Sequence, residues 1–236
     1  MTIELKINNV FDELNLYLTS NKLKPASIID LDVYISVDSK EKLNEEISNL
    51  ELRINKFFKN QNVVYSIKNY YKLKENFEEK SDEGVYHKRL EFYVAKDYFS
   101  LKRLLRARSD EEKGIALGYP MKSVIYFSKN IDGEVRNWNY FVVSIAKAKK
   151  AGIEIPRWLA YISFIPDNLD FLNKNVSYEA RILGKKYRRF VKKNNPELAK
   201  RVEECFFSMV LPDSWEKDSE GNYVLCYKIN DGCFKI

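Results

Sequence analysis

One short stretch of the sequence holds a dense set of basic side chains. Leu183, Tyr187 and Val191 recur at helical spacing, which predicts a helix from about Ser177 to Lys193 with one buried stripe. Cations occupy most of the remaining circumference, and such a surface can neutralise several phosphates of a nucleic acid. The basic residues are Arg181, Lys185, Lys186, Arg188, Arg189, Lys192 and Lys193.

This basic surface has three interpretations. The first is a non-enzymatic nucleic-acid interface, for RNA above all, with bases stacking on exposed tyrosines and with Arg103 and Arg106 of a predicted helix at 97–108 extending it. The second is a positive face that meets an acidic protein partner. The third is a solvated helix whose charges are balanced by nearby carboxylates, those of Glu179, Glu203 and Glu204.

A second set of residues could hold a metal ion. Asp30 and Asp32 alternate along a predicted strand at 28–37, so both carboxylates lie on one face and can share a cation such as Mg²⁺. Glu91, in a predicted strand at 88–95, could supply a third ligand. The pattern resembles the nucleotidyltransferase signature, with Thr19 standing where that signature has glycine. The alternative function is therefore a divergent Mg²⁺-dependent nucleotidyltransferase-like enzyme; otherwise the two aspartates lie on the solvent side of a half-covered sheet.

Other reactive side chains are few. His87 is the only histidine, which excludes a histidine pair as metal ligands, and it is predicted to lie at the surface. Cys205, Cys226 and Cys233 lack metal-ligand spacing and are predicted to be reduced. The sequence contains no Walker loop, dinucleotide-binding glycine motif or serine-hydrolase elbow. No cofactor is expected apart from Mg²⁺ in the nucleotidyltransferase-like alternative.

The first half of the chain must position the aspartates. Ile29, Leu31, Val33, Ile35 and Val37 alternate along the predicted strand, so they form its buried face. A helix at 10–18 precedes this strand. A long helix follows it, starting near Asp38, with apolar positions at Leu43, Ile47, Leu50, Ile54 and Phe57. Residues 63–73 are predicted as a strand and residues 74–84 as a charged loop.

The second half is predicted to be mainly helical. A short helix starts at Asp110, Gly118 ends it in the left-handed conformation, and the apolar run at 124–127 is buried after Pro120. A turn at 132–133, a helix from Asn137 ending near Gly152 and a buried segment at 156–165 follow. A helix at 196–210 precedes a β-hairpin at 223–236, whose turn is Asn-Asp-Gly.

Length and composition indicate a folded α+β protein. The chain has 236 residues, of which 45% are hydrophobic and 31% charged, with a formal net charge of +6. We expect an α/β N-terminal lobe at 1–95, with a small mixed or antiparallel sheet and a packed helix, and a mainly helical lobe at 96–236 ending in the hairpin. Because the sequence shows neither a membrane-spanning run nor a secretion signal, the predicted location is cytoplasmic.

The stretch from Glu112 to Phe127 is similar to a known pattern. Leu117-Gly118-Tyr119-Pro120, followed by Val124 and Phe127, resembles an uncharacterised, mainly archaeal family, domain of unknown function 483. The resemblance extends over about residues 97–193. Relatives carry cysteines where Met121, Lys122 and Ser123 stand here, so no thiol or metal role is carried over. The family has no assigned activity, and the resemblance implies a fold only.

Overall fold

The computed structural model describes residues 2–38, 40–69, 73, 77–81, 84–129, 145–146, 148–162, 178–210, 214–217, 219, 223–227 and 232–235. The chain forms two compact units, residues 1–118 and 119–236. The sequence suggested a boundary near Ala95. In the structure residues 96–118 belong to the first unit, because the helix that follows Ala95 packs against the sheet strands.

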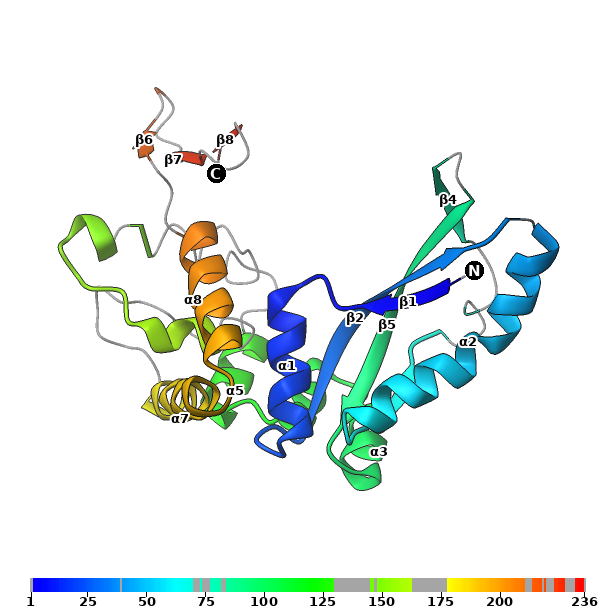
Figure 1. Ribbon diagram of the computed structural model, residues 1–236. Helices are drawn as coiled ribbons and strands as arrows, with labels where there is room; N and C mark the ends of the chain where they lie inside the picture. The colour runs from blue at the N-terminus through cyan, green and yellow to red at the C-terminus, as the bar shows by residue number, and fades with distance from the viewer. Residues whose placement is uncertain are drawn as a thin grey trace. The chain divides into compact units, whose positions relative to one another are not determined.

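The first unit is built on an antiparallel sheet (Figure 1). Its strands are β1 (Thr2–Lys6), β2 (Ala26–Ser36), β3 (Val64–Ile67), β4 (Glu78–Ser81) and β5 (Val85–Ala95). The strand order is β1-β2-β5-β3, and β4 pairs with β5 beside residues 85–87. The two long strands, β2 and β5, pair along their whole length. This pairing confirms the α+β class and the two strands predicted to carry the acidic residues.

Alternation along β2 creates the buried face that the sequence predicts. Leu31, Val33 and Ile35 are inaccessible to solvent, and α2 (Lys40–Asn60) packs Leu50 and Ile54 into the same core. Helix α1 (Val10–Ser20) contacts β2 and β5, and Figure 1 shows α1 and α2 as separate helices along the strands. The residues that alternate with these core positions on β2 lie on the opposite, more polar face of the sheet.

Two local predictions in this unit were wrong. The strand predicted at 63–73 ends at Ile67, because Asn69 adopts a left-handed conformation with φ of 57° in the turn that follows. The charged loop at 74–84 contains β4, whose sequence lacks apolar alternation and which forms by pairing with β5. The apolar position predicted at Phe57 in α2 is confirmed, because Phe57 is partly buried against the core, and Phe58, one helical turn after Ile54, is fully buried in addition.

Two short helices follow β5. Helix α3 (Tyr98–Arg106) begins at Asp97, whose carboxylate accepts the backbone N–H of Ser100 at 2.7 Å. Helix α4 (Asp110–Ala116) is capped by Ser109 and not by Asp110: the Ser109 hydroxyl accepts the backbone N–H of Glu112 at 3.1 Å. The left-handed Gly118 predicted after it is confirmed, with φ of 79°.

The second unit packs helices around a buried segment. Helices α5 (Met121–Lys129), α7 (Tyr178–Asn194) and α8 (Pro196–Val210) accompany the 3₁₀ helix η3 (Arg157–Tyr161), and both α7 and α8 contact η3. Strands β6 (Ser214–Lys217), β7 (Tyr223–Tyr227) and β8 (Gly232–Lys235) form an antiparallel sheet in that order. The predicted helix at 196–210 and the hairpin of β7 and β8 are confirmed, and β6 is an addition to them.

The remaining predictions for this unit have mixed outcomes. In α5, Val124 is buried but Ile125 is partly exposed, because a helix turns consecutive residues to different sides. Gly152 has the predicted left-handed conformation, with φ of 73°. The turn at 132–133 and the start of the helix expected from Asn137 lie outside the described residues.

Candidate nucleic-acid interface

Six of the seven predicted cations of α7 share one exposed side of the helix. Helix α7 buries Ala180, Gly184, Tyr187 and Val191. At 100° per residue, the exposed cations fall within an arc of about 140° on the other side. None of them forms an ion pair with a carboxylate of the described residues. We name this surface the α7 basic face; its residues are Arg181, Lys185, Lys186, Arg189, Lys192 and Lys193.

Close packing fixes the rotation of α7 about its axis. A Cβ atom at Gly184 would lie 2.8 Å from both the ring and the carbonyl oxygen of Trp158 in η3, so only glycine allows this approach. Tyr187, three residues later, is buried, and burial raises the pKa of its phenol, which stays neutral. The helix therefore cannot turn its cations inward without losing these contacts.

Arg188 belongs to a different group from its neighbours. Its Nε donates to Oε1 of Glu203 at 2.8 Å, and Arg157 donates to the other carboxylate oxygen at 2.9 Å. The Tyr161 hydroxyl also donates to Glu203, at 3.3 Å. Burial raises the pKa of Glu203, but the hydrogen bonds and charges of the two arginines outweigh it, so the pKa lies below its usual range. The carboxylate balance predicted from the sequence is thus present at Arg188, whose partly buried side chain is bonded to the buried Glu203 carboxylate.

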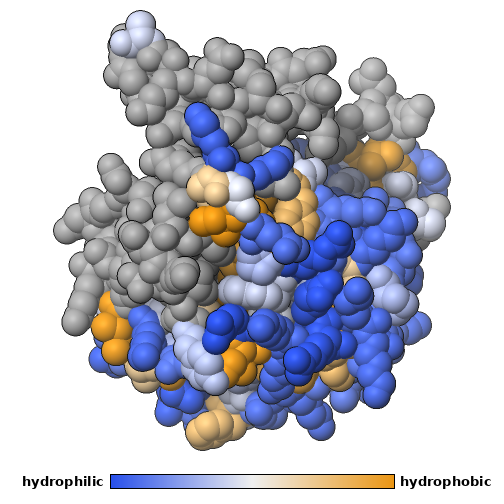
Figure 2. Space-filling model, turned by 90° about the vertical axis from the view of Figure 1, so that its left-hand side faces the viewer, coloured by the Kyte–Doolittle hydropathy of each residue, from blue (hydrophilic) through white to orange (hydrophobic). Residues whose placement is uncertain are grey.

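An aromatic ring accompanies the cations at the start of α7. The Tyr178 side chain is 62% exposed, and the Arg181 guanidinium carbon lies 5.3 Å from the centre of its ring. Ile182 is also exposed on this side. Figure 2 shows one face of the molecule, and the described surface on this face is largely hydrophilic with small separate hydrophobic patches. An exposed ring beside cations is the combination that single-stranded nucleic acids bind through their bases and phosphates.

The two predicted arginines of α3 lie in the first unit. Arg103 and Arg106 are exposed, and neither forms an ion pair with a carboxylate of the described residues. They line a pocket together with residues of α4. Because they belong to a different unit from α7, the idea that they extend the α7 basic face stays a prediction.

The proposed metal ligand Asp32 is buried and hydrogen-bonded. Its side chain is 3% exposed and accepts from Asn8 at 2.6 Å, from the His87 ring at 2.8 Å and from Arg89 at 3.1 Å. Burial raises the pKa of Asp32, but these hydrogen bonds together hold it below its usual range. The surface position predicted for Asp32 and for His87 is therefore wrong, because the side chains of Asn8, His87 and Arg89 surround the Asp32 carboxylate and the His87 side chain is itself only 12% exposed.

The other two predicted ligands lie opposite each other. Asp30 and Glu91 are directly paired in the register of β2 and β5, as the proposal of a shared site requires. Glu91 also forms an ion pair with Lys68, with an N–O distance of 2.8 Å. Burial and then the charge of Glu91 raise the pKa of Asp30. Among the residues that the structure describes, no group of three or more His, Cys, Asp and Glu side chains is arranged to hold a metal ion.

Two ionisable residues near this face were missed by the sequence reasoning. The Asp12 carboxylate accepts the backbone N–H of Asp30 at 3.3 Å, and burial together with the charge of Asp30 raises the pKa of Asp12 to about 6. Lys24 is buried, donates to the Asn15 side chain at 2.7 Å, and has its pKa lowered by burial to about 7. Neither residue is distinguished in the sequence from ordinary surface residues, because its burial comes from the packing of α1 on the sheet.

Comparisons of the chain with protein-family models, curated proteins and solved structures found no match. The resemblance to domain of unknown function 483 and the nucleotidyltransferase-like alternative therefore stay predictions. In the part of the chain that the structure describes, no helix has the length and apolar character needed to cross a bilayer. The function must be argued from the arrangement of side chains alone.

Proposed function

We propose that this protein binds single-stranded nucleic acid, RNA in the first place, through the α7 basic face. The observation that supports it is the set of six exposed cations without carboxylate partners among the described residues. Charged groups on a solvated helix are commonly paired at the surface, whereas unpaired cations on one side create a positive potential that attracts phosphates.

The mechanism is neutralisation of backbone phosphates with release of counterions. For a single strand, log K falls with log salt by about 0.7 for each phosphate neutralised, so six contacts would give a slope of about −4. Tyr178, at the N-terminal end of the face, offers its ring to one base. Recognition of this kind is tolerant of base sequence, and no chemical step is required.

The experiment compares two matched charge reversals by fluorescence anisotropy of labelled RNA and DNA, single-stranded and duplex, across a salt series. One variant carries Arg189→Glu and Lys192→Glu on α7. The control carries Arg53→Glu and Lys56→Glu, an exposed arginine and lysine with the same spacing on α2. Both variants change the net charge equally, so a nonspecific charge effect would appear in both.

We expect steeply salt-dependent binding by the wild-type protein. The α7 variant should lose about 1.4 from the slope of log K against log salt, because two phosphate contacts are removed. The α2 variant should keep its slope. The proposal is refuted by absence of saturable binding at low salt, or by equal weakening in the two variants.

A further inference from the structure

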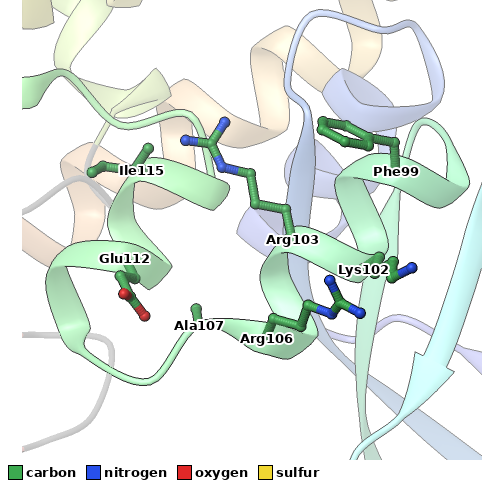
Figure 3. Close-up of a pocket in the computed structure, with 7 residues that line it drawn as sticks. All are labelled: Phe99, Lys102, Arg103, Arg106, Ala107, Glu112 and Ile115. Atoms are coloured by element: carbon green, nitrogen blue, oxygen red, sulfur yellow. The ribbon is translucent and has the colours of Figure 1, made fainter.

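A pocket of about 450 Å³ lies between α3 and α4 in the first unit (Figure 3). Its volume is within the range of small-molecule sites, about 300–1,000 Å³. Figure 3 shows the Arg103 side chain extending toward α4, between the Ile115 and Phe99 side chains in this view. The lining residues are Phe99, Lys102, Arg103, Arg106, Ala107, Glu112 and Ile115.

The spacing of residues along α3 explains why one aromatic ring and three cations line the same pocket. Positions 99, 102, 103 and 106 are separated by three or four residues, so they form one stripe along the helix. The opposite side of α3 buries Ser100, Leu101 and Leu104. Burial of that side and the cap at Asp97 hold the stripe outward, and the Phe99 side chain is 78% exposed.

The charge of the pocket is positive. The lining contains three basic side chains, those of Lys102, Arg103 and Arg106, and one carboxylate, that of Glu112. Glu112 accepts the backbone N–H of Arg108 at 2.6 Å. None of the three cations forms an ion pair with a carboxylate of the described residues. Cations in the last turn stabilise a helix through its dipole, and this role leaves their donors available to a ligand.

We propose that this pocket binds a nucleoside phosphate. The phosphate lies on the guanidinium groups of Arg103 and Arg106 and on the Lys102 amine, because guanidinium groups match phosphate oxygens in geometry and charge. The base stacks on the exposed ring of Phe99. The nucleotide is either free in solution or one residue of a strand. The proposal goes beyond binding at the α7 basic face and does not depend on it.

The test is calorimetric titration of the full chain with AMP, adenosine and inorganic phosphate. The first variant is Arg103→Ala with Arg106→Ala, and its control is Arg53→Ala with Lys56→Ala, which removes the same charge at the same spacing on α2. The second variant is Phe99→Ala, and its control is Tyr98→Ala, the neighbouring exposed aromatic that does not line the pocket. Circular dichroism verifies that all four fold.

We expect saturable AMP binding that weakens about tenfold or more in the double arginine variant. Phe99→Ala should weaken AMP binding by about tenfold and leave the affinity for inorganic phosphate unchanged. Both controls should bind AMP as the wild type does. The proposal is overturned if AMP does not bind saturably, or if variants and controls lose the same affinity.

Competition distinguishes the two sources of the nucleotide. Displacement of AMP by a short oligoadenylate identifies a strand residue as the ligand, and comparison with and without a 5′-phosphate shows whether it is the strand end. Displacement by mononucleotides alone identifies a free nucleotide. The Arg189→Glu and Lys192→Glu variant should retain AMP binding, so failure at the α7 basic face and failure at the pocket give different results.

Discussion

Arg188 and Arg189 are adjacent arginines on α7 with opposite surroundings, and replacing each with alanine separates folding from binding. Arg188 is one of two guanidinium partners of Glu203, whose side chain is 8% exposed. Arg189 is exposed and has no carboxylate partner among the described residues. The two substitutions remove the same atoms and the same charge from neighbouring positions of one helix.

The expected loss of stability follows from the contacts of Glu203. Breaking a buried pair costs about 3–5 kcal/mol when the remaining charge has no other partner. Here Arg157 stays bonded to Oε2, Tyr161 still donates to Oε1, and the Arg188 side chain is itself 31% exposed. We therefore expect Arg188→Ala to lower the free energy of unfolding by about 2 kcal/mol, the value of one charge-assisted hydrogen bond. Arg189→Ala should change it by less than about 0.5 kcal/mol.

Urea denaturation followed by circular dichroism measures these differences. Fluorescence anisotropy of labelled RNA measures binding across a salt series, under conditions in which both variants remain folded. Arg189→Ala should reduce the salt slope by about 0.7, and Arg188→Ala should not change it. Equal stabilities would show that the Glu203 ion pair does not hold α7. A reduced slope in Arg188→Ala alone would show that the binding surface has been assigned to the wrong side of the helix.

Three further predictions concern packing and pH. Gly184→Ala should lower the free energy of unfolding by about 1–3 kcal/mol, because its Cβ would meet Trp158; a stability equal to wild type in urea denaturation would contradict the packing. The folded-state pKa of Asp12, about 6, lies above its ordinary value, so the folded state retains a proton that the unfolded state loses. Asp12 therefore reduces stability as pH rises from about 4 to about 6, and unfolding midpoints of Asp12→Asn should lack that decrease. The pKa of Lys24, about 7, lies below its ordinary value, so its contribution to stability increases above about pH 7; Lys24→Met should remove this increase in the same measurement.

The sequence predicted those elements in which one face is buried along the whole length. Strand β2 and helices α2, α7 and α8 bury residues at regular spacing, which leaves a periodic pattern in the sequence. Strands β1 and β4 were missed because they carry no comparable pattern and form by pairing with β2 and β5. Such pairing depends on residues far away in the sequence, and no local window contains it.

The candidate site was predicted as a set of residue types, and the structure divides that set. All seven cations of α7 lie on the predicted helix, but their spacing does not show that Arg188 bonds to Glu203 on the next helix. Similarly, the alternation of Asp30 and Asp32 places both on one face without showing that Asp32 is enclosed by His87 and Arg89. A test of the metal alternative by replacing both aspartates would therefore confuse loss of a ligand with loss of a buried hydrogen-bond network.

Pairing and burial together separate the structural charges from those available to a ligand. In each unit a buried carboxylate is bonded to basic side chains: Asp32 to Arg89 and His87, and Glu203 to Arg157 and Arg188. A guanidinium held in such a cluster reaches a phosphate only by giving up a hydrogen bond to a buried carboxylate. The cations on the exposed sides of α3 and α7 carry no such cost. The formal charge of +6 alone is a weak argument for nucleic acid, whereas its concentration on two exposed helix faces, each with an exposed aromatic ring, is a specific one.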